Sequence, residues 1–278
     1  MAPAPIPSAP PRRPDPALIE GLRARVRALE GVRFGAPEAV VPLGAEAIDR
    51  ALPWGGLPRA GLHEIVAGTG ERGDRERGDG ARGAPIENEG AGERGGGDAI
   101  GAATGFAAAL AGRLAGARGP VLWCLGRGDL HGPGLGAFGL TPARLIVARA
   151  RAASDVLWAM EAGLRAGRLG AVLGEVAGLD AVAGRRLALA ARERATPCLL
   201  LRPAEAAAGV AVTRWRVAAA PSARADGLAG LGRPRWRLAL VRCRGGVPRS
   251  WLVEWDDAAP GFLVVSPLGV GAAGERAA

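Results

Sequence analysis

The stretch ERGGGDAIGAATGF, residues 93–106, lies between two patterns that together decide the fold. Upstream, GLHEIVA at residues 61–67 is a short and mostly apolar run, which is typical of a buried strand. Downstream, residues 100–117 are rich in alanine and predict a helix. A strand, a glycine-rich segment and a helix in this order form the layout of a phosphate-binding loop, so the stretch is a candidate nucleotide site.

A working phosphate-binding loop needs more than glycines. It also needs a lysine for the phosphate charge and a Ser or Thr hydroxyl for magnesium. Gly96 and Gly101 have the required separation, but Ala102 and Ala103 follow where the lysine and the hydroxyl belong, and the chain contains no lysine. We therefore predict a vestigial phosphate loop, no catalytic residues, no ATP hydrolysis and no bound cofactor.

Other catalytic or ligand motifs are weak. GTGERG at residues 68–73 matches a dinucleotide fingerprint, but a charged segment follows it instead of a helix, and a chance match is expected in a chain with 45 glycines. His63 lies inside a predicted strand and is interpreted as a hydrogen-bonded core histidine. Glu64 and Glu175 are interpreted as strand-end carboxylates, with a metal- or water-binding role as the alternative. The three cysteines form no metal-binding cluster, so we expect no metal and reduced core thiols.

Short apolar runs alternate with helical patterns through the middle of the chain. Strands are expected at residues 120–125, 145–148, 170–174 and 197–201, and helices at 154–165, capped by Ser154 and closed by Gly167, and at 182–194. This alternation predicts an α/β fold with a mostly parallel sheet flanked by helices. Longer segments at residues 210–217, 235–243 and 250–256 alternate polar with apolar residues and predict appended antiparallel strands, with a hairpin turn at Gly245-Gly246.

Composition divides the chain into four regions. Residues 1–35 combine a proline-rich tail with an amphipathic helix at 15–30, and residues 36–210 form the α/β core. Within the core, residues 69–98 hold ten glycines, eight acids and five arginines, a composition that predicts a disordered insert. Residues 211–265 form a basic antiparallel extension, and 266–278 a flexible tail. No apolar run reaches the length of a membrane span, and we expect a cytoplasmic protein without a membrane partner.

The net charge of +9 comes mostly from the C-terminal region, where residues 211–251 hold nine arginines and a single acid, Asp226. Alternation in RPRWRLAL places Arg233, Arg235 and Arg237 on one face of a strand and Trp236 on the opposite, core-facing side. Such a row suits DNA phosphates or a protein partner, and a plain solvated surface in an arginine-rich chain is the alternative. The candidate nucleic-acid or partner surface comprises Arg214, Arg216, Arg233, Arg235, Arg237, Arg242 and Arg244.

Residues 43–65, LGAEAIDRALPWGGLPRAGLHEI, resemble the entry into the ATPase core of RecA-like proteins. AVLGEV resembles the strand that carries the Walker B carboxylate, with Glu175 at the aspartate position. A closer resemblance is to the ImuA family, the RecA-like and cell-division-inhibitor-like proteins of a bacterial mutagenesis cassette. It rests on phrases such as LPWGGLPRAGLHEI, DVLWAMEAGLRAG and PRWRLALVRCRGGVPRSWLVEWDDA, and spans residues 43–258.

The ImuA resemblance implies a non-catalytic accessory factor of damage-induced (SOS) translesion DNA synthesis. It implies two main partners, an ImuB-type Y-family polymerase-like protein and an error-prone replicative-type DNA polymerase. RecA and DNA are further candidate partners, and nucleoid association is expected when the protein is active. Two alternatives remain: a RecA-like, nucleotide-dependent recombination ATPase that uses an arginine such as Arg94 at the phosphates, and a plain DNA-binding module.

Overall fold

The computed structural model describes residues 40–68, 91–126, 130–204, 209–222 and 232–268. These residues lie in one compact unit, Phe34–Ala278. The predicted N-terminal helix and residues 69–90 of the predicted insert lie outside the described residues. The strands are β1 (Val40–Val41), β2 (Leu57–Pro58), β3 (Leu62–Ala67), β4 (Val121–Leu125), β5 (Leu145–Arg149), β6 (Ala171–Glu175), β7 (Cys198–Arg202), β8 (Thr213–Ala219), β9 (Arg235–Cys243), β10 (Arg249–Asp256) and β11 (Gly261–Leu268). The helices are α2 (Glu46–Asp49), α3 (Ala91–Ala115), α4 (Ala153–Ala166) and α5 (Ala181–Arg194), with short 3-10 helices η2 (Gly132–Phe138) and η3 (Pro142–Arg144).

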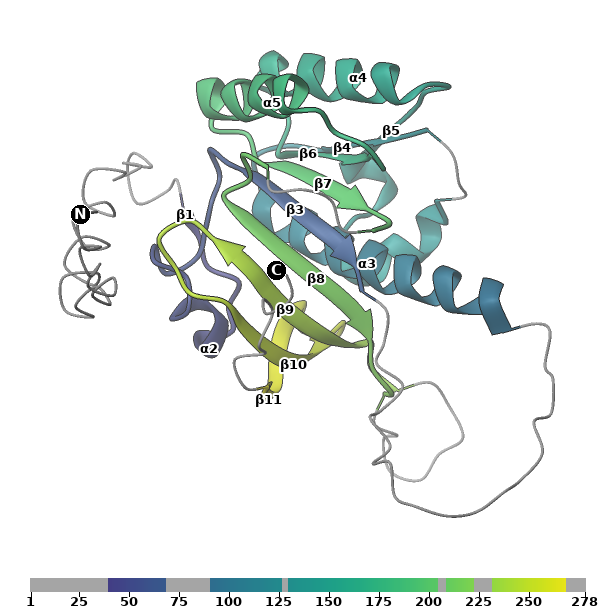
Figure 1. Ribbon diagram of the computed structural model, residues 1–278, viewed down its shortest axis with the longest axis vertical. Helices are drawn as coiled ribbons and strands as arrows, with labels where there is room; N and C mark the ends of the chain where they lie inside the picture. Colours follow the sequence, from purple (N-terminus) through teal and green to yellow (C-terminus); the bar gives the residue numbers. More distant parts are fainter. Residues whose placement is uncertain (1–39, 69–90, 127–129, 205–208, 223–231, 269–278) are drawn as a thin grey trace, which may run out of the picture. The chain divides into compact units, whose positions relative to one another are not determined.

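One large sheet organises the fold. Its nine strands follow the order β11-β10-β9-β8-β3-β7-β6-β4-β5, and β1 and β2 pair separately. The strands from β8 to β5 in this order run parallel, and β3, β6 and β7 are buried along nearly their whole length. Helices α4 and α5 cover one face of the parallel strands, whereas α3 lies on the other (Figure 1). The structure thus confirms the predicted α/β class.

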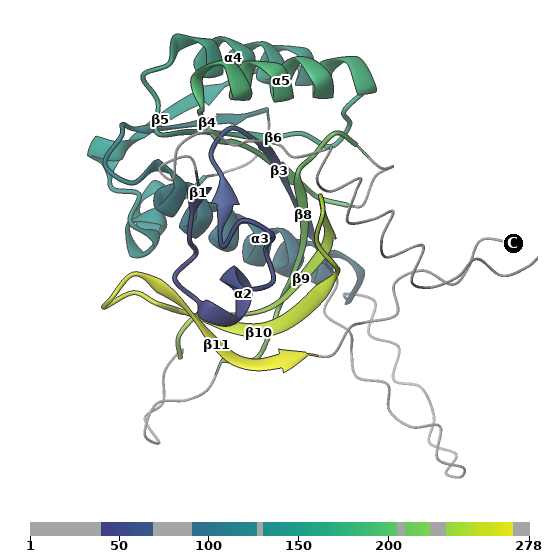
Figure 2. The ribbon, with the colours of Figure 1, turned by 90° about the vertical axis from the view of Figure 1, so that its left-hand side faces the viewer.

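The other end of the sheet is antiparallel and curved. Strands β8, β9, β10 and β11 pair in sequence as neighbours, and β9 to β11 curve around α3 (Figure 2). The turn between β9 and β10 contains Gly245 at φ +74, a conformation that glycine adopts without strain, and this confirms the predicted hairpin. The strand β9 has the predicted bounds, with Trp236, Leu238 and Leu240 buried on the side that faces the core.

An aromatic cluster fills the space between α3 and the curved strands. Phe106 of α3 is fully buried, and its ring centroid lies 6.0 Å from that of Trp215, 5.9 Å from that of Trp236 and 5.5 Å from that of Phe262. These aromatic side chains supply much of the apolar area that holds the antiparallel strands against α3. The tryptophans of the basic segment are therefore core residues, as the alternation within that segment indicates.

Two details of the C-terminal region differ from the prediction. The strand β8 pairs antiparallel with β9, as predicted, but on its other side it runs parallel to β3 and so continues the parallel sheet. The sheet also extends beyond residue 265. Ser266 pairs with Leu252, and Pro267 with Trp251, so β11 includes the first three residues of the predicted flexible tail.

Two helix starts also differ from the prediction. The helix α3 begins at Ala91, so residues 91–98 are helical although the sequence predicts a glycine-rich loop and disordered insert there. Each glycine costs about 1 kcal/mol relative to alanine in a helix, and the alanine-rich segment that follows extends the helix despite this cost. The helix α4 begins at Ala153 without a side-chain cap, so Ser154 is not the N-cap, whereas Gly167 closes it at φ +67 as predicted. Asp180 caps α5 by accepting from the amides of Val182 and Ala183.

Candidate functional site

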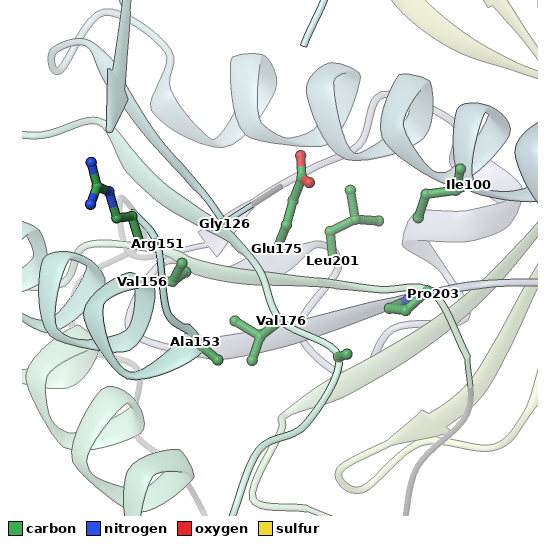
Figure 3. A pocket seen from close by; sticks show the side chains of 10 residues that line it. Ile100, Gly126, Arg151, Ala153, Val156, Glu175, Val176, Leu201 and Pro203 are labelled. Atoms are coloured by element: carbon green, nitrogen blue, oxygen red, sulfur yellow. The ribbon is translucent and has the colours of Figure 1, made fainter. Parts of the chain in front are cut away.

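A crevice opens at the carboxyl ends of the parallel strands. Its volume is about 380 Å³, and it lies between the ends of β4, β6 and β7, the helix α3 and the start of α4. Figure 3 shows Ile100 of α3 on one side, Arg151 on the other, and Glu175 and Leu201 between them. Open α/β sheets bind ligands in this place, outside the carboxyl ends of their strands. The lining residues are Ile100, Gly126, Arg151, Ala153, Val156, Glu175, Val176, Ala177, Leu201 and Pro203.

Glu175 is the acidic residue of the crevice, at the end of β6. Its Oε1 accepts a hydrogen bond of 2.8 Å from the indole Nε1 of Trp123 on β4. Burial raises the pKa of Glu175, and the Trp123 hydrogen bond opposes this by favouring the charged form. The carboxylate thus lies at the end of β6 and is held by a buried tryptophan of the neighbouring strand, and the choice between a plain strand-end carboxylate and a metal- or water-binding role stays a prediction.

The positions of the predicted phosphate loop all lie within α3. The amides of an α-helix beyond its first turn donate to carbonyls of the preceding turn, so a segment in this conformation cannot wrap its amides around phosphates. Gly96 and Gly101 lie inside the helix, and Ala103 is fully buried in the core. The position expected for a magnesium-binding hydroxyl is therefore a packing position. The vestigial origin of the loop remains a prediction.

His63 is fully buried and fully hydrogen-bonded. Its Nε2 lies 2.9 Å from the carbonyl oxygen of Pro58 and therefore carries the proton, which leaves Nδ1 as the acceptor from the Thr213 hydroxyl at 2.8 Å. Trp215 in turn donates from Nε1 to the same hydroxyl oxygen at 3.0 Å. Desolvation lowers the pKa of His63 to about 4, with the Pro58 bond opposing the shift. The histidine is a neutral core residue, as the sequence predicts.

Glu64 forms the centre of a buried ion-pair cluster next to His63. Its Oε2 lies 2.5 Å from Nε of Arg214 on β8, and its Oε1 lies 3.6 Å from Nη1 of Arg202 on β7. Arg202 also donates from Nη2 to the carbonyl oxygen of Ala177 at 3.0 Å. The cluster joins three neighbouring strands, and it shows that Glu64 has a structural partner that the sequence does not reveal.

The predicted arginine surface is largely occupied by contacts within the protein. Arg214 pairs with Glu64, Arg233 with Asp256, and Arg235 with Glu254. Arg242 donates to the carbonyl oxygen of Gly209, and Arg216 also has a partner. Among the described residues, Arg237 and Arg244 have no side-chain partner. The seven arginines are spread along β8 and β9: Arg233, Arg235 and Arg237 lie near the carboxyl end of β8, and Arg242 and Arg244 lie near its amino end.

Sequence reasoning did not identify the surface of α4 and the neighbouring edge strand. Trp158 of α4 is 70% exposed, and Ile146 and Val147 of β5 are 46% and 41% exposed. The helical pattern contains the signal for Trp158, because Val156, Met160 and Leu164 occupy the buried face and leave Trp158 on the other side. Large exposed apolar side chains of this kind are typical of protein interaction sites.

The fold and the crevice define the class of this protein as α/β, with a candidate ligand site at the carboxyl edge of a mostly parallel sheet. In the part of the chain that the structure describes, no three His, Cys, Asp or Glu side chains come together in a way that could hold a metal. No described helix is both long and apolar enough to span a membrane.

Comparisons with known proteins place the chain in a family. It is 35% identical over 251 residues to the protein ImuA of two strains of Caulobacter vibrioides, and the match covers 84% of this chain and 91% of the relative. The chain therefore belongs to the ImuA family, a family with a role in damage-induced mutagenesis. No protein-family model matches the chain. The crystal structure of SulA from Pseudomonas aeruginosa is similar over 37% of this chain and 88% of that one, with 22% identity and a TM-score of 0.33.

Proposed function

We propose that the protein is a non-catalytic accessory factor of damage-induced translesion DNA synthesis that scaffolds an ImuB-type protein and an error-prone DNA polymerase. Membership in the ImuA family supports the setting. The two proposed partners are those that the resemblance to the ImuA family implies. The exposed apolar surface around Trp158 is compatible with the recruitment of a protein partner.

The crevice is the observation that supports a non-catalytic role. A nucleotide triphosphate needs cations and free backbone amides around its phosphates. Here the crevice is lined mostly by apolar side chains, its basic residue is Arg151, and the helix α3 occupies the place of the glycine loop. Loss of the lysine and the magnesium ligand removes several kcal/mol of transition-state stabilisation, of order 3 kcal/mol for each group.

Direct DNA binding is a weaker candidate role for the arginine surface. Each phosphate contact needs a guanidinium that is free to approach DNA, and three of the seven candidate arginines have carboxylate partners. No observation on the described residues favours a recombination ATPase over the accessory role.

ATP turnover tests the proposal. We expect the purified full chain to show no ATP binding by titration of a fluorescent ATP analogue, and no phosphate release with or without single-stranded DNA. Glu175→Gln should leave both readouts unchanged, because glutamine can still accept the Trp123 hydrogen bond and no catalysis depends on the carboxylate. DNA-stimulated turnover that disappears in Glu175→Gln would contradict the proposal and support the recombination ATPase.

A further inference from the structure

A second cavity, at the opposite edge of the sheet from the crevice, combines apolar and basic side chains. Its volume is about 280 Å³, and it lies between α5, the start of β3, the segment before β8 and the turn after β9. Leu189 of α5 and the side chains of Val210 and Val212 form its apolar part, and Arg185, Arg192 and Arg244 its basic part. We refer to these six residues as the α5 groove.

Within the part of the chain that the structure describes, the three arginines of the groove have no side-chain partner. Among the described residues, none of their guanidinium groups forms a hydrogen bond or an ion pair, and no acidic residue lines the cavity. This differs from Arg186 on the same helix, which pairs with Glu161 of α4. An unpaired guanidinium binds a carboxylate through two parallel hydrogen bonds, so the groove offers three sites for acidic side chains.

The helix α5 also exposes apolar side chains along the same side. Leu189 is 58% exposed, and Val182, two helical turns before it, is 65% exposed. Arg185 and Arg192 lie between and beyond them at spacings of three and four residues, which place all four on one face of the helix. The face therefore alternates apolar and basic residues and ends in the cavity.

We infer that the α5 groove binds an acidic, apolar peptide segment of a protein partner. The inference rests on the proposed scaffolding function and adds the chemistry of the segment that docks: leucine-like side chains enter beside Leu189, Val210 and Val212, and flanking carboxylates pair with the arginines. Peptide grooves that recognise amphipathic segments combine these same features.

The shape of the groove favours a peptide over DNA. Phosphates of a duplex are read by rows of basic side chains on a surface that follows the backbone, and they gain nothing from a concave apolar lining. Val212 is buried, Val210 is half-buried and Leu189 is exposed, and together they give the cavity an apolar lining that suits an apolar side chain. A carboxylate-bearing apolar segment satisfies both halves of the site.

Fluorescence anisotropy with defined probes tests the inference on the full chain. The probes are an acidic amphipathic peptide of glutamate and leucine, the same peptide with glutamine in place of glutamate, and a short DNA duplex. We expect the acidic peptide to bind more tightly than the glutamine peptide. The triple variant Arg185→Ala, Arg192→Ala, Arg244→Ala should weaken its binding by on the order of 10- to 100-fold, because three charge-assisted contacts are lost. Leu189→Gln should weaken it several-fold.

A matched variant removes the same charge elsewhere. Arg50, Arg168 and Arg249 are exposed and lie outside the groove, so their replacement by alanine should change peptide affinity by less than about threefold, through long-range electrostatic effects alone. Equal losses in both triple variants, equal affinity for the two peptides, or a DNA affinity that depends on the groove arginines more than the peptide affinity does would each overturn the inference.

Co-purification of the tagged chain from DNA-damaged cells separates this inference from the function on which it rests. If the wild-type chain recovers a polymerase-type partner and the groove triple variant does not, both are supported. Unchanged recovery with the triple variant overturns the groove and leaves the scaffold in place. If the wild-type chain recovers no such partner although it binds the acidic peptide through the groove, the scaffold fails and the peptide site remains.

Discussion

Replacing Glu64 with glutamine is expected to lower the free energy of unfolding by about 3–5 kcal/mol, which corresponds to a fall in thermal midpoint on the order of 10 °C. Glu64 is 1% exposed and lies between Arg214 and Arg202, which are themselves buried. Removal of its charge takes away the carboxylate that pairs with both of these buried guanidinium groups. Urea denaturation followed by circular dichroism measures the change.

The exposed pair of Glu46 and Arg50 provides the control. These side chains are 75% and 78% exposed and lie one turn apart on the surface, so Glu46→Gln should cost less than about 0.5 kcal/mol. A second control is the double variant Glu64→Leu, Arg214→Met, which should be less destabilised than the sum of its single changes because it removes both charges together. Equal costs for Glu64→Gln and Glu46→Gln would contradict the buried cluster.

Acidification from pH 6.5 to pH 4 is expected to remove about 3 kcal/mol of stability through His63 alone. In the unfolded chain this histidine takes up a proton near 6.5, whereas desolvation lowers its pKa to about 4 in the folded protein. Between these values the unfolded state binds more protons than the folded state. The contribution of His63 to the free energy of unfolding is therefore fully present above pH 6.5, decreases as the pH falls, and no longer changes below pH 4.

The variant His63→Gln isolates this effect from the titration of the carboxylates. Glutamine does not titrate, so the difference in free energy of unfolding between wild type and variant should be constant above pH 7 and should narrow by about 3 kcal/mol as the pH falls to 4. Denaturation curves of both proteins across this range supply the measurement. A difference that does not change with pH would show that the histidine is not held neutral by its buried site.

The strands β3 to β10 could be predicted from local patterns because each contains a run of apolar or alternating residues, whereas β1, β2 and β11 were not predicted as strands. The bounds of β9 agree with the prediction, and those of β4 and β6 differ from it by a single residue at one or both ends. The start of α3 could not be predicted, because glycine propensity indicates a loop and the alanine-rich helix overrides it. The direction of β8 depends on its pairing with β3, about 150 residues earlier in the chain, and no local pattern encodes such a pairing.

The site was less predictable than the fold for a related reason. Glu64 and Arg214 are 150 residues apart in sequence and form a buried pair, and Glu175 is held by Trp123 on another strand. Sequence alternation correctly places Arg235 and Arg237 on the outer face of β9, but it does not show that Glu254 of β10 pairs with Arg235. Sequence alone singles out Arg244 for the candidate partner surface, but Arg185 and Arg192 of α5 lie beside it only because of the tertiary fold, so no local pattern indicates the groove.

Damage-induced mutation frequency in cells tests the non-catalytic account most directly. A strain that lacks this protein is complemented with wild type or with the double variant Arg151→Ala, Glu175→Gln, which removes both ionisable groups that line the crevice, and the two proteins are matched for expression. The account predicts that the double variant restores ultraviolet-induced mutagenesis to the wild-type level, well above that of the strain without the protein. A folded double variant that leaves mutation frequency at the level of that strain would show that the crevice performs essential chemistry, and would contradict the account.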